Sequence, residues 1–149
     1  MHKIIYRLLV LVVMLLGGTQ AYQSQTSVGG TLDGIVTYVI DGDTLRVNGV
    51  KVRIWGIDAP EKDQPYYDEA TRVLQAQSLF HAVTCSVKDQ DRYGRLVAQC
   101  LRRKDQKDIA AIMVQNGLAR DYARHSKRYY LPQQIKAQAQ RKGLWKSSR

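Results

Sequence analysis

Two turn dipeptides set between β-forming stretches constrain the fold of this chain more than any other feature. Asp41-Gly42 and Asn48-Gly49 are both typical of tight hairpin turns. The stretch before the first turn, residues 32–39, and the stretch between the turns, residues 44–47, are rich in β-formers. Residues 50–57 then alternate apolar and polar side chains, as in a strand with one buried face. Two successive tight turns therefore predict a three-stranded meander.

The remainder of the chain predicts two more strands and three helices. Their order after the meander is helix, strand, strand, helix, helix, and five short strands arranged in this way can close into a small barrel. The predicted fold class is α+β, a five-stranded OB-fold (Greek-key) barrel with three α-helices. The expected helices cover about 68–82, 105–116 and 132–144, where the second begins either at Asp105 or at Lys107-Asp108. The expected strands cover 83–88 and 96–101.

The first 21 residues have the pattern of an export signal. Lys3 and Arg7 precede the apolar run 8–16, and Thr19-Gln20-Ala21 resembles a cleavage site. The alternative is a membrane anchor, which needs about 20 apolar residues and so exceeds this run. We therefore expect an exported protein, periplasmic or secreted, without stable membrane association after cleavage. Residues 22–30 are expected to be a flexible start, and residues 31–146 to form one domain.

The charge balance favours polyanionic partners. The chain carries a formal net charge of +10, which falls to about +8 once Lys3 and Arg7 leave with the signal. Such a domain attracts DNA, RNA or anionic surfaces, although many basic proteins bind nothing specific.

The two cysteines fit a cross-strand pair. If the predicted hairpin turns between Arg92 and Tyr93, Cys85 lies directly opposite Cys100. This arrangement predicts a disulfide, which an exported protein can form. Two buried thiols packed side by side are the alternative.

Three short segments bring together carboxylates and arginines. They are Asp41-Gly42-Asp43-Thr44, the stretch from Arg53 to Glu61, and Arg92-Tyr93-Gly94-Arg95. Each alone could be a turn or a strand end, but adjacent antiparallel strands would place Asp43 and Asp58 together, with Arg53 and Glu61 beside them. Carboxylate oxygens bind hard cations, and arginines bind phosphate oxygens. The set therefore points to attack of water on a phosphodiester.

These segments resemble those of the staphylococcal (micrococcal) nuclease family, and the likeness runs from about Gly30 to Trp145. The resemblance implies an OB barrel with three helices, and a monomeric Ca²⁺-dependent nuclease that hydrolyses DNA and RNA and leaves 3′-phosphates. The loop after Glu61 is short for the family, which bears on substrate access.

The resemblance also implies a role for each acidic residue. Asp43 and Asp58 would bind Ca²⁺, together with the main-chain carbonyl of Ala59. Asp41 would support the metal site without touching the ion. Glu61 would orient the attacking water or take its proton.

The basic and aromatic residues receive roles in the same way. Arg53 and Arg95 would bind the phosphate under attack. Arg92 and Tyr93 would hold a terminal phosphate, with Arg92 replacing the family's usual lysine. Tyr122 is the nearest candidate for a base-stacking aromatic, and a packed surface aromatic is its alternative.

Two other functions stay open on the sequence alone. One is a domain of this fold that binds nucleic acid without cutting it, and the other is an OB-type adaptor for protein or oligosaccharide. The sequence does not rank DNA against RNA. We expect no catalytic role for His81, on the first helix, or for His125, and we expect packing roles for Tyr66, Tyr67, Tyr129 and Tyr130.

Overall fold

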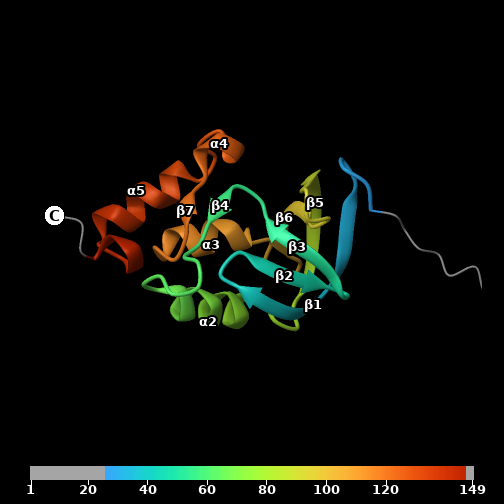
Figure 1. Cartoon of the computed structure of the whole chain (residues 1–149), viewed down its shortest axis with the longest axis horizontal. Coiled ribbons are helices and arrows are strands. Elements are labelled where there is room, and N and C mark those ends of the chain that lie inside the picture. Colours follow the sequence, from blue (N-terminus) through green and yellow to red (C-terminus); the bar gives the residue numbers. More distant parts are fainter. Residues whose placement is uncertain (1–25, 147–149) are drawn as a thin grey trace, which may run out of the picture.

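A closed barrel of five strands forms the β half of the protein (Figure 1). The structure is a computed structural model that describes residues 26–146, so the expected export signal lies outside the described residues. The strand order around the barrel is β1-β2-β3-β6-β5, and β1 closes the ring by pairing with β5. These strands are β1 (Thr31–Asp41), β2 (Thr44–Val47), β3 (Val50–Ile54), β5 (Ala82–Gln90) and β6 (Leu96–Arg102). The predicted meander and the five-stranded barrel are confirmed.

One strand pair in the barrel is parallel. β3 and β6 run side by side with Val52 opposite Leu96 and Arg53 opposite Val97, whereas the other barrel pairs are antiparallel. β6 shows strict alternation of buried and half-buried residues, so every second side chain enters the barrel core. The parallel pair therefore places the end of β3 beside the start of β6.

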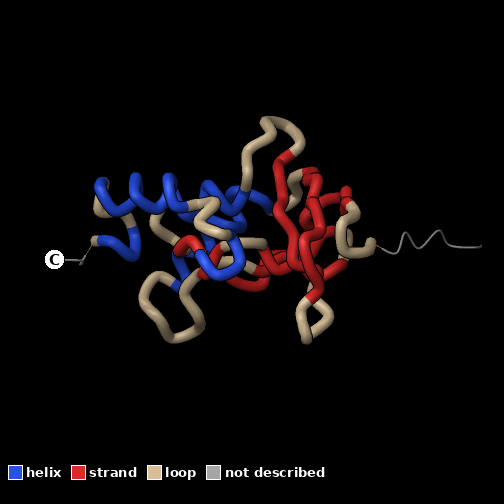
Figure 2. Tube along the Cα trace, turned by 90° about the horizontal axis from the view of Figure 1, so that it is seen from above, coloured by secondary structure: helices blue, strands red, loops and turns tan. Residues whose placement is uncertain are grey.

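The helices gather on one side of the barrel (Figure 2). α2 packs on β1, and α3 packs between β6 and α5. The helical elements are α2 (Tyr67–Ser78), α3 (Ile109–Gln115), α4 (Ala123–Ser126), α5 (Leu131–Ala139) and the 3₁₀ turn η1 (Gly143–Trp145). Within residues 26–146, no helix is long and apolar enough to cross a bilayer.

The third strand is shorter than predicted. β3 ends at Ile54, and Ile57–Asp58 instead forms β4, which pairs with β7 (Arg120–Asp121) on the side of the barrel that faces the helices (Figure 1). Gly56 interrupts the strand because its φ is +77°, and a Cβ there would lie 2.9 Å from the ring of Tyr130. The alternation of residues 50–54 gave no sign of this break.

Several helix boundaries also differ from prediction. The third predicted helix is shorter than expected, because α5 ends at Ala139 and Gly143–Trp145 forms the separate turn η1. α2 begins at Tyr67, with Tyr66 as its N-cap residue in place of Asp68. It ends at Ser78, so His81 lies beyond the helix and not on it. The left-handed backbone of Phe80, with φ of 61°, turns the chain from the helix into β5.

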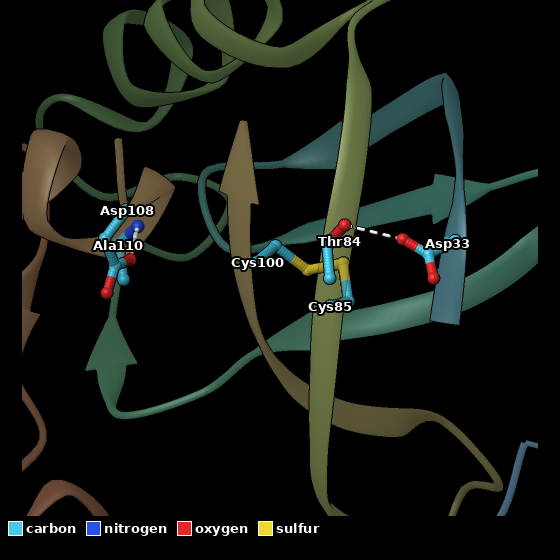
Figure 3. Close-up of a disulfide and its surroundings, with 6 residues drawn as sticks. All are labelled: Asp33, Thr84, Cys85, Cys100, Asp108 and Ala110. Carbon is cyan, nitrogen blue, oxygen red and sulfur yellow. Dashed lines mark hydrogen bonds between the residues drawn. A yellow bond between two sulfur atoms is a disulfide. The ribbon is translucent and has the colours of Figure 1, made fainter. Parts of the chain in front are cut away.

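The predicted disulfide joins β5 and β6 (Figure 3). Cys85 and Cys100 are directly opposed across the ladder, and both are fully buried. The register that paired them at the sequence level is therefore correct at this point. Closer to the hairpin tip, a bulge between Val87 and Asp89 shifts the strand register by one residue.

Candidate active site

Asp43 occupies the tight turn between β1 and β2 and is held there on three sides. Its own N–H donates to Asp41 Oδ1 at 3.1 Å, and its carbonyl accepts from the Ile54 N–H at 2.8 Å. Its Oδ2 accepts from the Ala59 N–H at 2.9 Å. Gly42 allows this approach, since a Cβ there would lie 2.8 Å from the Cβ of Ala59. The turn, the end of β3 and the chain after β4 therefore converge on one carboxylate.

Arg53 bridges the two predicted metal-binding carboxylates. Its Nη2 lies 3.3 Å from Asp43 Oδ2 and 3.7 Å from Asp58 Oδ1. Its Nη1 donates to the Ile54 carbonyl at 2.9 Å, which orients the guanidinium. The convergence of Asp43, Arg53 and Asp58 that the sequence predicted is present in the structure.

The nearby positive charge and hydrogen-bond donors do not fully compensate the burial of the Asp43 carboxylate. Burial raises its pKa from 3.8 to about 6, although Arg53 and the Ala59 N–H act in the opposite direction. A buried carboxylate with a raised pKa gains from a bound cation, because the cation replaces the lost hydration.

The donors around Asp43 fit a hard cation. Asp43, Asp58 and the Ala59 carbonyl offer oxygen atoms, which Ca²⁺ prefers. The Asp58 side chain is 55% exposed, so it faces solvent from which an ion can enter. Within residues 26–146, no cluster of three or more His, Cys, Asp or Glu side chains forms a metal site. Water and phosphate oxygens would have to complete the coordination of any ion held by these three residues.

Arg95 is linked to the same cluster through Thr44. Its Nη1 lies 3.5 Å from Thr44 Oγ1, and that hydroxyl donates to Asp43 Oδ1 at 3.1 Å. On its other side, Arg95 Nε donates to Asp91 Oδ2 at 2.6 Å. Asp91 Oδ1 in turn accepts from the N–H groups of Tyr93 and Arg95, so one carboxylate holds both the hairpin tip and the guanidinium.

Arg53 and Arg95 line one hollow, which we call the first hollow. Its volume is about 910 Å³, within the range of ligand sites. The predicted substrate-binding residues Arg92, Tyr93 and Tyr122 also line it. Arg92 Nη2 donates to the Tyr93 hydroxyl at 2.8 Å, so these two side chains act together.

Glu61 lies outside the hydrogen-bonded cluster. It is exposed at the start of the loop between β4 and α2, and its N–H donates to Gln64 Oε1 at 2.9 Å. Within the described part of the chain, its carboxylate has no hydrogen bond or ion pair. It does not line the first hollow, so its predicted action on the attacking water stays a prediction.

The sequence reasoning missed several residues of the site. Asp91 carried a signal, because an aspartate that opens a turn four residues before an arginine can bind both. His125 was set aside, yet it lines the first hollow and its ring lies 4.7 Å from that of Tyr122, centre to centre. Lys88 and Arg124 also line this hollow, and no local pattern marked them. Of the four tyrosines expected to pack, Tyr130 is fully buried and Tyr129 is 58% exposed.

Comparison with known proteins gives a consistent match. The family model described as staphylococcal nuclease homologue matches residues 51–147. A protein named "Uncharacterized endonuclease" from Escherichia coli is 34% identical over 119 residues, which cover 76% of this chain and 77% of that protein. "Micrococcal nuclease" of Shigella flexneri is 32% identical over 126 residues, covering 75% and 72%. "Succinoglycan biosynthesis protein ExoI" of Rhizobium meliloti is 32% identical over 120 residues, covering 73% and 62%.

Proposed function

Because this chain belongs to the staphylococcal nuclease family, we propose that it is a Ca²⁺-dependent nuclease that hydrolyses phosphodiester bonds of DNA and RNA, leaving 3′-phosphate ends. Family membership supports the hydrolysis of nucleic acid, and the donor set supports the choice of metal. The observation that carries the proposal is the position of Arg53 Nη2, 3.3 Å from Asp43 and 3.7 Å from Asp58, in the hollow that Arg95 also lines.

Asp43, Asp58 and the Ala59 carbonyl would hold the ion. Bound Ca²⁺ would polarise a phosphate oxygen and make the phosphorus a better target for water. Asp41 would act through the turn, by fixing the Asp43 N–H with its Oδ1. Thr44 would orient Asp43 by donating its hydroxyl hydrogen to Asp43 Oδ1.

The arginines would stabilise the negative charge of the phosphate. Arg53 lies beside both carboxylates, where it can bind a non-bridging oxygen throughout the reaction. Arg95 would contribute most as charge builds on the phosphorus centre, because preorganised donors aimed at developing charge raise turnover. Glu61 would orient the attacking water or accept its proton from the solvent-facing side.

Three residues of the first hollow would hold the rest of the substrate. Arg92 and Tyr93 would bind a further phosphate, and the exposed Tyr93 ring offers a flat surface. Tyr122 would stack on a base, with the neighbouring His125 ring extending its surface. We also propose that the mature protein is exported and monomeric. A buried disulfide is compatible with export, because disulfides persist in oxidising compartments.

The direct test is cleavage of plasmid DNA and of RNA by the purified protein, with Ca²⁺ and with chelator. We expect cleavage in Ca²⁺, none in chelator, and recovery when Ca²⁺ is restored. Glu61→Gln and Arg95→Ala should each lower the rate by roughly 10²–10³, by analogy with other transition-state donors, while thermal unfolding stays near that of the wild type. Full activity in chelator would rule out the metal. Tight DNA binding without cleavage in Ca²⁺ would instead identify a binding protein.

A further inference from the structure

A second hollow borders two of the candidate metal ligands, Asp58 and Ala59. Its volume is about 430 Å³, and its walls include Asp58, Ala59, Gln64, Tyr66 and Arg120. The first hollow reaches Ile57, the residue before Asp58. The linings of the two hollows therefore adjoin along the chain, with Ile57 in the first and Asp58 and Ala59 in the second. A phosphodiester within a strand has one neighbouring nucleotide on each side.

The second hollow has the chemistry of a nucleotide site. Arg120 supplies a guanidinium, and β4 pairs with β7 so that Arg120 stands directly opposite Asp58. The Arg120 guanidinium lies 5.4 Å from the centre of the Trp145 ring, a contact that steadies the long side chain. Tyr66, Pro60, Pro65 and Leu144 add an aromatic ring and apolar walls. Arginine binds phosphate, and an aromatic ring with apolar neighbours accepts a base or a sugar.

The loop that forms one wall is held in an unfavourable backbone conformation. Tyr66 has φ of 72° and Asp63 has φ of 71°, a region that costs free energy for a residue with a side chain. The same loop is fastened to Glu61, because Gln64 Oε1 accepts from the Glu61 N–H and the Gln64 N–H donates to the Glu61 carbonyl at 3.0 Å. The Tyr66 side chain is partly buried against the hydrophobic core and also lines the hollow, so packing holds its ring in place there.

We propose that the second hollow binds the nucleotide on the opposite side of the cleaved bond from the first hollow, with Arg120 on its phosphate and Tyr66 against its base or sugar. This proposal rests on the proposed nuclease function. The substrate would cross the metal ligands as an extended strand and occupy both hollows at once. Such a site suits cleavage within a strand, because the enzyme then gains affinity from nucleotides on both sides of the bond.

The test uses oligonucleotides with a single cleavable phosphodiester, extended by nucleotides on one side, on the other side, or on both. Arg120→Ala removes the phosphate contact, and Tyr66→Gly removes the ring at a position where glycine accepts the backbone. Each should lower kcat/KM on the order of 10- to 100-fold, but only for substrates extended on one particular side. Arg92→Ala should affect the opposite extension. The charge control is Arg103→Ala, since Arg103 is exposed and lines neither hollow.

Three results would overturn the proposal. Arg120→Ala and Tyr66→Gly could act like Arg103→Ala, their losses could be equal for all substrates, or both could affect the same extension as Arg92→Ala. Because Arg120→Ala could disturb β7, Tyr66→Gly provides a separate reading, with thermal unfolding as the check on folding. If the wild type cleaves no substrate in Ca²⁺, the proposed function itself fails. The second hollow is then still tested by anisotropy of a labelled oligonucleotide, which Arg120→Ala must weaken.

Discussion

Asp91 should govern catalysis without touching the substrate. Its Oδ2 accepts from Arg95 Nε at 2.6 Å, and the two side chains are 21% and 23% exposed. Burial alone would raise the pKa of Asp91, but its hydrogen bonds to Arg95 and to the N–H of Tyr93 hold that pKa below 3.8. The carboxylate is therefore charged throughout the neutral pH range and keeps the guanidinium in one orientation.

The substitution Asp91→Asn separates two roles of Asp91, which are to hold the hairpin tip and to orient the Arg95 guanidinium. The asparagine Oδ1 can still accept from the N–H groups of Tyr93 and Arg95, so the hairpin tip is kept, but its amide nitrogen cannot accept from Arg95 Nε. A hydrogen bond between charged groups contributes about 1.5–3 kcal/mol, and partial exposure favours the lower end. If Arg95 acts mainly on the transition state, kcat should fall by about tenfold with little change in KM.

Steady-state cleavage of a fluorogenic oligonucleotide in saturating Ca²⁺ measures both constants. Asp89→Asn is the matched control, because Asp89 lies in the same hairpin and the first hollow but does not contact Arg95 in the described structure. Combining Asp91→Asn with Arg95→Ala should cost no more than Arg95→Ala alone. Additive losses, or an unchanged kcat in Asp91→Asn, would refute this account of Arg95 positioning.

Three further predictions concern stability. Because the pKa of metal-free folded Asp43 is about 6 against 3.8 when unfolded, its contribution to stability should fall by roughly 3 kcal/mol as the pH rises from about 4 to 6. Urea unfolding of the wild type and of Asp43→Asn measures this difference, which saturating Ca²⁺ should abolish, and a pH-independent difference without metal would contradict it. Replacing Cys85 and Cys100 by alanine should cost about 3 kcal/mol, given the 15-residue separation, with cleavage retained below the unfolding transition; an unchanged urea midpoint would count against this estimate. Gly42→Ala should cost about 1–3 kcal/mol and reduce Ca²⁺ affinity by calorimetry, because its Cβ would push on Ala59; wild-type affinity would argue against that close approach.

The sequence predicted the parts of the fold that depend on local patterns. Asp41-Gly42 and Asn48-Gly49 specify tight turns by their backbone preferences, and so the β1–β2–β3 meander followed directly. The pairing of Cys85 with Cys100 was predicted by counting back from an assumed turn between Arg92 and Tyr93. The bulge between Val87 and Asp89 lies between that turn and the pair, and the predicted register holds only on the cysteine side of the bulge.

The features that were missed depend on distant contacts. The break at Gly56 results from close packing on Tyr130, which no pattern within residues 50–57 contains. His125 and Arg124 enter the first hollow because the short helix α4 follows β7, and β7 is placed by its pairing with β4. Spacing along the chain could not predict this arrangement.

The parallel pairing of β3 with β6 has a consequence for when the protein becomes active. Arg53 lies on β3 and Arg95 immediately precedes β6, so the two arginines meet only when these strands join. Joining strands far apart in the chain is entropically costly and tends to be slow. We therefore expect that a chain with its hairpins formed but β3 and β6 still apart would hold the proposed catalytic side chains and cut nothing. In a refolding experiment, the rate at which cleavage returns would therefore report the rate at which β3 and β6 pair.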